Sequence, residues 1–439
     1  MNAPGGRDAS DDEGAPEPTG KVAPQPWIAA PETVAVVEAL AAEGAEVRFV
    51  GGCVRDAVLQ RPVEDIDIAT PEPPERVIAL LEKAGIKAIP TGIEHGTVTA
   101  VIGEARFEVT TLRVDVETDG RRAKVAFTDD WRADAARRDF TINTLSCTLA
   151  GDIYDPMGGL DDLGHHRVRF VGNAEKRIEE DVLRLLRFFR MYAVYGRPPP
   201  DIEALAACRA LALRLSGLSG ERVRDEMLRI LMAPDAADTI MLMRGEGVLE
   251  HVLPEAGDVG RLRMLTWLET SAIKVASVAP DPLRRLAALL DVDAARVGSV
   301  AARLRLSNQQ TERLVRMAPP PHDVTPDVDE RSLRRALNRA GADVVRDLVL
   351  LAWAGELAVT PRRRGERTQA WLDTLAAADA WTPVDFPLKG RDVTALGVPA
   401  GPRIGELLGA VEAWWEDGDY RADRKACLEK LGALAGGAR

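Results

Sequence analysis

Two aspartates on either side of an isoleucine, Asp65 and Asp67, are the residues of this chain best suited to chemistry. Ile66 and Ile68 alternate with them, and this period of two indicates a strand with both carboxylates on one face and both isoleucines in the core. Like charges held side by side repel each other, and divalent cations relieve that repulsion. Such a carboxylate pair suits Mg²⁺, and two metal ions about 3.5–4 Å apart can promote transfer at phosphorus.

A pair of glycines, Gly51 and Gly52, follows an apolar run over residues 47–50 and precedes a helix-like segment that starts near Cys53. Glycines at a strand-to-helix turn let the backbone approach a phosphate, and the first N–H groups of the helix point at it. Each feature alone has a plain explanation, because paired glycines are commonly a simple loop and Asp-x-Asp is commonly a solvated strand face. Together they outline a site for a nucleoside triphosphate.

Two further segments carry polar residues that suit a nucleotide. Glu108 alternates with apolar neighbours in residues 105–112, so it is either a third carboxylate facing the aspartate pair or an exposed strand glutamate. Residues 137–143 read Arg-Arg-Asp-Phe-Thr-Ile-Asn. The guanidinium fork of arginine fits triphosphate oxygens, whereas Asp and Asn fit ribose hydroxyls.

Helices are expected over residues 31–44 and 74–84, each with proline in its first turn, and a single helix is expected over residues 174–195. Asp181 and Arg184 are three residues apart and would share a face of that helix, either as a functional pair or as a surface ion pair. Arg187 and Arg190 continue the row. This segment is a local basic patch in a chain of net charge −12.

These motifs together resemble those of the class II nucleotidyltransferases, which comprise the CCA-adding tRNA nucleotidyltransferases and the bacterial poly(A) polymerases. The matching runs are Gly-Gly-x-Val-Arg-Asp-x-x-Leu (51–59), Glu-Asp-Ile-Asp-Ile-Ala-Thr (64–70), Arg-Arg-Asp-Phe-Thr-Ile-Asn (137–143) and Glu-Asp-x-x-Arg (180–184). Thr144 stands where the family usually has Ala. The resemblance implies an α+β fold, with an N-terminal polymerase-beta-like nucleotidyltransferase head followed by an all-α neck, body and tail.

The resemblance also implies roles for the residues of the head. Asp65 and Asp67 would hold two Mg²⁺ ions, and Glu108 would help to activate the attacking hydroxyl. The triphosphate and ribose of the incoming nucleotide would be bound by Gly51, Gly52, Arg55, Arg138, Asp139 and Asn143.

For the helix, the resemblance implies that Asp181 and Arg184 select the incoming base without a template, with Arg187 and Arg190 beside them. A fixed carboxylate and guanidinium match the Watson–Crick edge of cytosine, and that of adenine after a small shift.

Residues 113–138 are polar, contain glycine and are mixed in charge, and we expect a long loop there. This segment resembles, in position, the flexible loop that is implicated in the switch from CTP to ATP in CCA-adding enzymes. Asp119 and Arg121 are the residues of interest in it.

The 439-residue chain is 46% apolar, which suits a globular protein of several domains, and no run of 18 apolar residues predicts a membrane span. Its four cysteines are far apart, which argues against a zinc site or disulfides and for a reducing cytoplasm. The expected parts are a disordered acidic tail (1–25), the head (26–150), the base-selecting neck (151–215), a helical body (216–330) and a tRNA-binding helical tail (331–439).

The predicted function is template-independent addition of C and A, from CTP and ATP, to the 3′ end of tRNA. A poly(A) polymerase, the A-adding half of a divided CCA system and a catalytically silent RNA-binding protein are the alternatives. Poly(A) enzymes of this family usually carry a basic Gly-Arg-Arg-Phe-type segment after the catalytic carboxylates and a strongly basic C-terminus. Residues 90–96 read Pro-Thr-Gly-Ile-Glu-His-Gly and the C-terminus is mixed in charge, so both features favour CCA addition.

Overall fold

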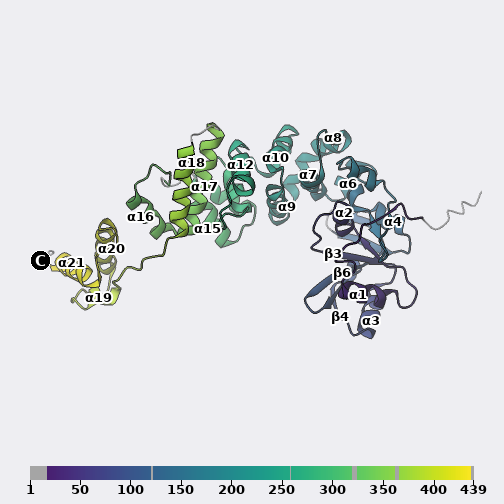
Figure 1. Cartoon of the computed structure of the whole chain (residues 1–439), viewed down its shortest axis with the longest axis horizontal. Coiled ribbons are helices and arrows are strands. Elements are labelled where there is room, and N and C mark those ends of the chain that lie inside the picture. The colour runs from purple at the N-terminus through teal and green to yellow at the C-terminus, as the bar shows by residue number, and fades with distance from the viewer. Residues whose placement is uncertain (1–16, 120–121, 258, 319–323, 361–364, 437–439) are drawn as a thin grey trace, which may run out of the picture. The chain divides into compact units, whose positions relative to one another are not determined.

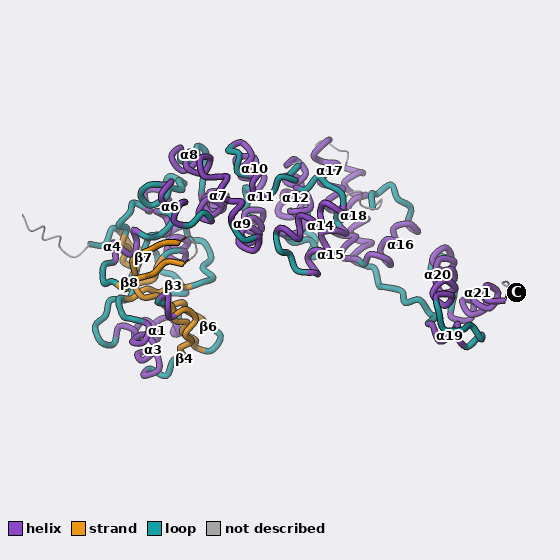
Figure 2. The backbone as a smooth tube through the Cα atoms, turned by 180° about the vertical axis from the view of Figure 1, so that it is seen from behind, coloured by secondary structure: helices purple, strands orange, loops and turns teal. Residues whose placement is uncertain are grey.

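The computed structural model describes residues 17–119, 122–257, 259–318, 324–360 and 365–436 (Figure 1). Its internal contacts divide the chain into two compact units. One unit contains the residues up to Glu226 together with Leu242–Val252, and the other contains Met227–Met241 and the residues from Leu253 onward. The strands that the structure describes all belong to the first unit, and the second is helical (Figure 2). No described helix is both long enough and apolar enough to cross a membrane.

An eight-stranded sheet forms the centre of the first unit, in the order β1-β10-β9-β2-β3-β6-β5-β4. Strands β3 and β6 are parallel, and the other neighbours in the sheet are antiparallel. The strands are β1 (Gly20–Lys21), β2 (Arg48–Val50), β3 (Ile66–Thr70), β4 (Lys87–Gly92), β5 (Thr97–Ile102), β6 (Ala105–Thr111), β9 (Ser146–Cys147) and β10 (Asp152–Tyr154).

Two helices pack on this sheet, and a third contacts one of them. Helix α3 (Pro74–Lys83) lies against β4, β5 and β6 and also contacts α1 (Pro31–Ala41), whereas α2 (Gly52–Val58) packs on β2 and β3. Helices α1 and α3 both have proline in the first turn, where the N–H that proline lacks has no intrahelical partner. The predicted helices at 31–44 and 74–84 are therefore confirmed, and the predicted strand forms at Ile66–Thr70, with Asp67 inside it and Asp65 directly before it.

Residues 113–138 form a β-hairpin and a helix, so the prediction of a long loop was wrong. Strand β7 (Arg113–Asp119) pairs with β8 (Arg122–Phe127), and α4 (Trp131–Ala136) follows them. In the sequence, Val114 and Val116 alternate with charged residues, and this period of two favours a strand over a loop. Arg121 and the side chain of Asp119 lie outside the part of the chain that the structure describes.

The expected disordered tail at 1–25 also differs from the structure in part. Residues 1–16 lie outside the described residues, but Gly20–Lys21 forms β1 at the edge of the sheet, paired with β10. The side chain of Val22 is buried, and the ring of Trp27 packs edge-on against Phe49. These apolar contacts order a segment whose composition alone suggested disorder.

The single helix expected over 174–195 is two helices, α6 (Ala174–Glu180) and α7 (Leu183–Tyr195). Asp181 has extended backbone angles, φ −149° and ψ 105°. Its carboxylate accepts a hydrogen bond from the N–H of Leu183 at 3.2 Å, so it caps the start of α7 as short polar side chains commonly do. The chain therefore turns between α6 and α7, and Asp181 lies outside both helices.

The remaining helices complete the α+β fold, with a strand-containing head followed by helical segments, as the sequence predicted. They are α5 (Gly159–Gly164), α8 (Ile202–Leu211), α9 (Gly220–Met232), α10 (Ala236–Gly245), α11 (Leu249–Val252), α12 (Val259–Trp267), α13 (Pro282–Leu289), α14 (Ala294–Arg303), α15 (Asn308–Arg316), α16 (Glu330–Ala340), α17 (Ala342–Val359), α18 (Gly365–Asp379), α19 (Gly390–Thr394), α20 (Pro402–Asp417) and α21 (Arg424–Gly436).

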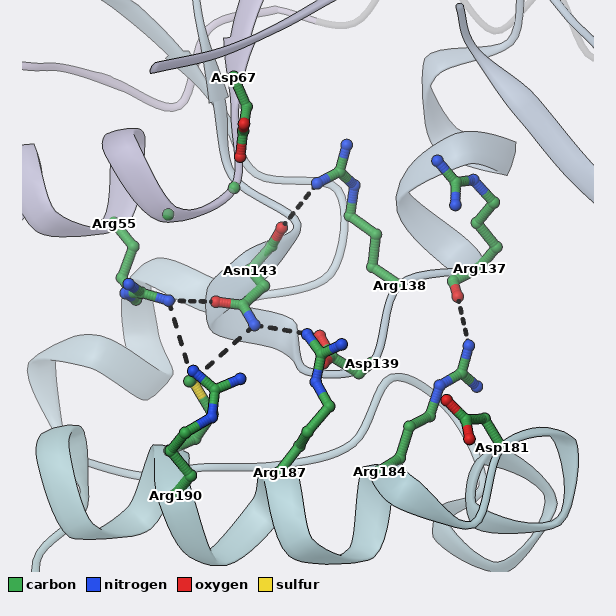
Figure 3. A pocket seen from close by; sticks show the side chains of 13 residues that line it. Arg55, Asp67, Arg137, Arg138, Asp139, Asn143, Asp181, Arg184, Arg187 and Arg190 are labelled. Carbon is green, nitrogen blue, oxygen red and sulfur yellow. Dashed lines mark hydrogen bonds and ion pairs between the residues drawn. The ribbon is translucent and has the colours of Figure 1, made fainter. Parts of the chain in front are cut away.

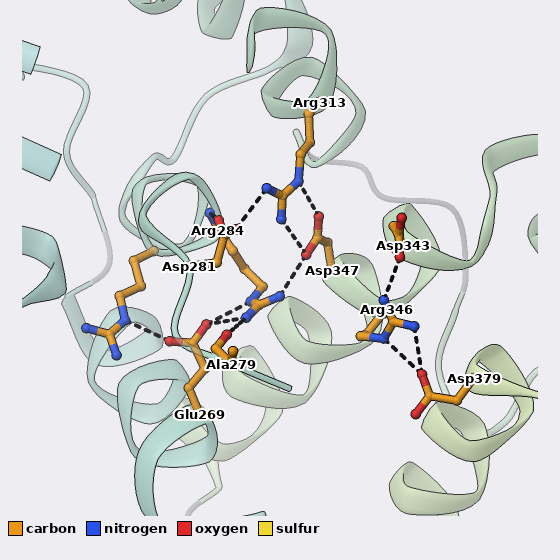
Figure 4. A network of polar contacts seen from close by, with 10 residues as sticks. Glu269, Ala279, Asp281, Arg284, Arg313, Asp343, Arg346, Asp347 and Asp379 are labelled. Atoms are coloured by element: carbon orange, nitrogen blue, oxygen red, sulfur yellow. Dashed lines mark hydrogen bonds and ion pairs between the residues drawn. The ribbon is translucent and has the colours of Figure 1, made fainter. Parts of the chain in front are cut away.

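A buried network of ion pairs holds α12, α13 and α17 of the second unit together (Figure 4). Glu269, just after α12, accepts hydrogen bonds from the guanidinium groups of Arg284 and Arg285 at 2.8 and 2.7 Å. Arg284 also donates to Asp347 of α17 at 2.8 Å. All four side chains are at most 5% exposed, so each of these buried charges depends on its partners.

Candidate active site

The glycine turn after β2 shapes one wall of the site. Gly51 has φ +72°, a left-handed conformation that glycine adopts without strain. A Cβ at this position would lie 3.1 Å from the guanidinium of Arg138, so the missing side chain leaves room for that arginine. The N–H of Gly51 donates to the carbonyl of Leu145 at 2.9 Å and is therefore already used within the fold. The amides at the start of α2, from Gly52 onward, are the ones that face a phosphate in our interpretation.

Carboxylates meet where β3 and β6 run side by side. Asp67 in β3 is in register with Glu108 in β6, and Asp65 immediately precedes β3. The pKa of Asp67 is raised from its ordinary value of 3.8 to about 6, chiefly by burial and also by the negative charges of Glu108 and Asp65, and the positive charge of Arg138 limits the rise. The structure thus places the three predicted acids within electrostatic reach of one another, at one edge of the site.

A cavity of about 390 Å³ opens beside this carboxylate cluster (Figure 3). It is bounded by the glycine turn, by residues 137–143 and by α7. Eleven of the thirteen predicted site residues line it; Asp65 and Glu108 do not. The lining residues are Gly51, Gly52, Arg55, Asp67, Arg137, Arg138, Asp139, Asn143, Asp181, Arg184, Arg187, Arg190 and Met191.

Asn143 connects three sides of the cavity (Figure 3). Its side-chain oxygen accepts from Arg55 at 2.6 Å, and its amide nitrogen donates to Asp139 at 3.0 Å. The other oxygen of Asp139 pairs with Arg187 of α7 at 2.7 Å. Burial opposes the ionisation of Asp139, but Arg187 and the hydrogen bonds from Asn143 and Phe140 outweigh it and hold the pKa of that carboxyl below its usual range. Residues from α2, the 137–143 segment and α7 are thereby fixed relative to one another.

Asp181 and Arg184 each have a different partner, which corrects the prediction that they share a helical face. The carboxylate of Asp181 accepts two hydrogen bonds from Arg222 of α9, at 2.8 and 3.0 Å. Arg184 donates to Glu180 at 2.5 Å and to the backbone carbonyl of Arg137 at 3.3 Å. Because the helix breaks at Asp181, both side chains nevertheless reach the cavity, one from the turn and one from α7.

Sequence reasoning missed several contributors to the site. Arg137 and Met191 line the cavity, and Asp134 of α4 pairs with the arginines at 137 and 138. Arg222 is 41 residues from the aspartate that it holds, so no local pattern could have revealed that pair. Arg137 had a detectable signal, because it is the first residue of the Arg-Arg-Asp motif.

The residues at the carboxylate edge suit a divalent cation. Asp67 is partly buried beside two further acids; burial and the negative charges of those acids both disfavour its ionised form, and a bound cation would favour that form. Among the described residues, no group of three or more His, Cys, Asp or Glu side chains is arranged to enclose a metal ion. A site of one or two carboxylates, completed by substrate phosphates, is the arrangement that Mg²⁺ commonly uses.

Comparisons with known proteins agree with this geometry. Residues 47–169 match the family model of the Poly A polymerase head domain, and residues 200–258 match that of the probable RNA and SrmB-binding site of polymerase A. The chain is 35% identical over 396 residues to CCA tRNA nucleotidyltransferase 1, mitochondrial, of Danio rerio, covering 88% of this chain and 87% of that protein. It is 32% identical over 404 residues to the CCA-adding enzyme of Streptococcus gordonii, covering 90% and 95% of the two chains.

Solved structures of CCA-adding enzymes share the fold of this chain. The crystal structure of the Bacillus stearothermophilus CCA-adding enzyme in complex with CTP has a TM-score of 0.73 at 27% identity, covering 92% of this chain and 97% of that one. The Thermotoga maritima CCA-adding enzyme complexed with tRNA has a TM-score of 0.57 at 21% identity, which shows a shared fold.

Proposed function

We propose that this chain, which belongs to the class II family of CCA-adding tRNA nucleotidyltransferases, adds C and A from CTP and ATP to the 3′ end of tRNA. One observation carries the proposal: a carboxylate-bearing strand edge and an arginine-lined cavity adjoin in a chain that aligns with CCA-adding enzymes over almost its whole length. Enzymes of this family use divalent metal ions, and we propose Mg²⁺ for this one.

In this mechanism Asp65 and Asp67 would hold the metal, with Glu108 beside them. A bound divalent ion supplies Lewis-acid activation of the tRNA 3′-hydroxyl and neutralises charge on the triphosphate. The arginines of the cavity orient the triphosphate so that its α-phosphorus faces the hydroxyl. Because Arg55 and Arg138 are held by protein acceptors, they are positioned before the nucleotide arrives, which lowers the entropic cost of binding.

Base selection would take place at the end of the cavity that Asp181 and Arg184 line. We propose that Asp181 and Arg184 present an acceptor and donors to the Watson–Crick edge of C or A. Hydrogen bonds that fix both side chains support this proposal. Arg222 donates two to the carboxylate of Asp181, and the guanidinium of Arg184 donates one to Glu180. Groups that are fixed in this way discriminate between bases better than mobile ones, since a mismatched base leaves them without partners.

We also propose a cytoplasmic location and the division of the helical part into neck, body and tail. The support for a reducing compartment is that the four cysteines are buried and unpaired, and that burial raises the pKa of Cys53 to about 12, which keeps its thiol protonated. The proposed boundaries at 150, 215 and 330 follow the sequence motifs, and expression of the separate segments would test them.

The decisive experiment supplies tRNA lacking one, two or three terminal nucleotides with CTP alone, ATP alone or both. We expect two C additions with CTP, one A addition to the substrate that lacks only A, and complete CCA ends with both. A ladder of A residues from ATP alone would instead support a poly(A) polymerase, and A addition without C addition would support the divided system. Asp67→Ala is the matched control; it should abolish addition while tRNA binding, measured by filter retention, stays close to that of the wild type.

A further inference from the structure

One buried carboxylate outside the cavity, Asp134 of α4, contacts three arginines of the head. Its side chain is 5% exposed. One oxygen accepts from Arg137 at 2.8 Å, and the other accepts from Arg138 at 3.1 Å. The first oxygen also accepts the backbone N–H of Arg113 at 3.2 Å. Burial opposes ionisation of Asp134, but the two guanidinium groups outweigh it and lower the pKa of this carboxyl, so it is a stable anion.

These contacts join the nucleotide cavity to the β7–β8 hairpin. Arg137 and Arg138 both line the cavity, whereas Arg113 is the first residue of β7. Arg113 also donates from its side chain to the carbonyl of His95, in the turn before β5. The base of the hairpin and the two cavity arginines therefore share one anchoring carboxylate.

We infer that Asp134 is a positioning residue, which holds Arg137 and Arg138 in the geometry that receives the triphosphate and ties that geometry to the base of the hairpin. The inference rests on the proposed function, because it assigns the two arginines to nucleotide binding. Asp134 does not line the cavity itself, so it acts through the arginines.

The consequences of removing this charge follow from the neighbours of Arg138. Its guanidinium lies against the glycine turn and is close enough to Asp67 to lower the pKa of that carboxyl. Without the charge of Asp134, the carboxylate of Asp67 remains near enough to attract Arg138. An arginine drawn away from its position beside Asp134 would no longer face the triphosphate. In Asp134→Asn, the affinity for the nucleotide should therefore fall more than the rate at which the bound complex reacts.

The test compares Asp134→Asn with Asp130→Ala, a matched change in the same helix. Asp130 caps the start of α4 by accepting the N–H groups of Arg132 and Ala133, and it is exposed. Asp134→Asn should raise KM for CTP and for ATP by about tenfold or more, because charge-assisted hydrogen bonds are roughly twice as strong as neutral ones, while kcat changes less than about threefold. Asp130→Ala should lower the melting temperature through loss of the cap and leave KM unchanged.

A double-mutant cycle separates positioning from general stability. Arg138→Gln should raise KM, and Asp134→Asn should raise KM by a smaller factor in that variant than in the wild type, because only the contact with Arg137 is left to lose. A wild-type KM in Asp134→Asn, or an equal rise of KM in Asp130→Ala, would overturn the inference. If Asp134→Asn fails to fold, Asp134→Glu keeps the charge but displaces the guanidinium groups by one methylene and should also raise KM; a wild-type KM in that folded variant would count against positioning. Failure of the wild type to extend tRNA would instead reject the proposed function itself.

Discussion

The most informative single substitution is Asp67→Asn, because it should stabilise the protein while it inactivates the enzyme. Asp67 carries its charge in a partly buried position beside Glu108 and Asp65, which is why its pKa lies well above the ordinary value of 3.8. A carboxyl that is harder to ionise in the folded state than in the unfolded state destabilises the fold whenever it is ionised. Asparagine has the same shape without the charge.

The magnitude follows from the pKa of about 6. Each tenfold change in acidity corresponds to about 1.4 kcal/mol, so the ionised carboxylate costs the metal-free head about 3 kcal/mol above pH 6. Between pH 3.8 and 6 the folded state binds more protons than the unfolded state, and the cost therefore grows as pH rises through that window. Asp67→Asn should gain about 3 kcal/mol at pH 7.5, roughly half of that at pH 5, and almost nothing below pH 4.

Amide hydrogen exchange of β3 and β6 measures this gain in the full-length chain without requiring the whole molecule to unfold in one step. The experiment uses EDTA at pH 5 and pH 7.5, and Asp65→Asn is the matched control, since Asp65 is exposed. We expect both variants to lose nucleotide addition and only Asp67→Asn to become more protected. Adding Mg²⁺ at pH 7.5 should protect the wild type and leave Asp67→Asn unchanged. Equal protection of wild type and Asp67→Asn at pH 7.5, or a gain independent of pH, would refute the reasoning.

Two further predictions concern the second unit. Glu269→Gln should lower the free energy of unfolding by about 3–5 kcal/mol in urea titration, because Arg284 and Arg285 would keep buried charges without their shared partner (Figure 4); a loss below about 1 kcal/mol would show that these arginines find other partners. Arg334 of α16 pairs through two hydrogen bonds with Asp419, just after α20, at 2.8 and 2.9 Å. Arg334→Gln, or 1 M salt in the wild type, should speed amide exchange at the end of α20, and unchanged exchange under both conditions would contradict a role for this pair in holding the two segments together.

Local patterns in the sequence were sufficient for the elements that carry the catalytic motifs. The alternation of Asp65 and Asp67 with isoleucines predicted β3, and the prolines at 31 and 74 predicted where α1 and α3 begin. In these segments the same residues determine both the local conformation and the buried face, so the period of the pattern is enough to predict the helix or strand.

The prediction failed where contacts between distant segments decide the conformation. Asp181 sits in a sequence with strong helical periodicity, yet its carboxylate caps α7 and binds Arg222, and these bonds outweigh the cost of ending α6. The charged residues of 113–138 suggested a loop, but that segment pairs with itself as a hairpin and is anchored at its base by Asp134. Arg222 cannot be identified from the neighbours of Asp181 in the chain, whereas the hairpin had a local signal in the alternation of Val114 and Val116 with charged residues.

The net charge of the whole chain likewise does not describe the charge around the cavity. A chain of charge −12 is a poor candidate for binding a triphosphate or RNA if its charge is spread evenly. The cavity, however, is lined by six arginines and three aspartates, so its surface is strongly basic while the molecule as a whole is acidic. The acidic partners within and beside the cavity, such as Asp139 and Asp134, do not abolish this basic character. They hold guanidinium groups that would otherwise repel one another, and they leave the remaining donors directed at the space that the nucleotide is proposed to occupy.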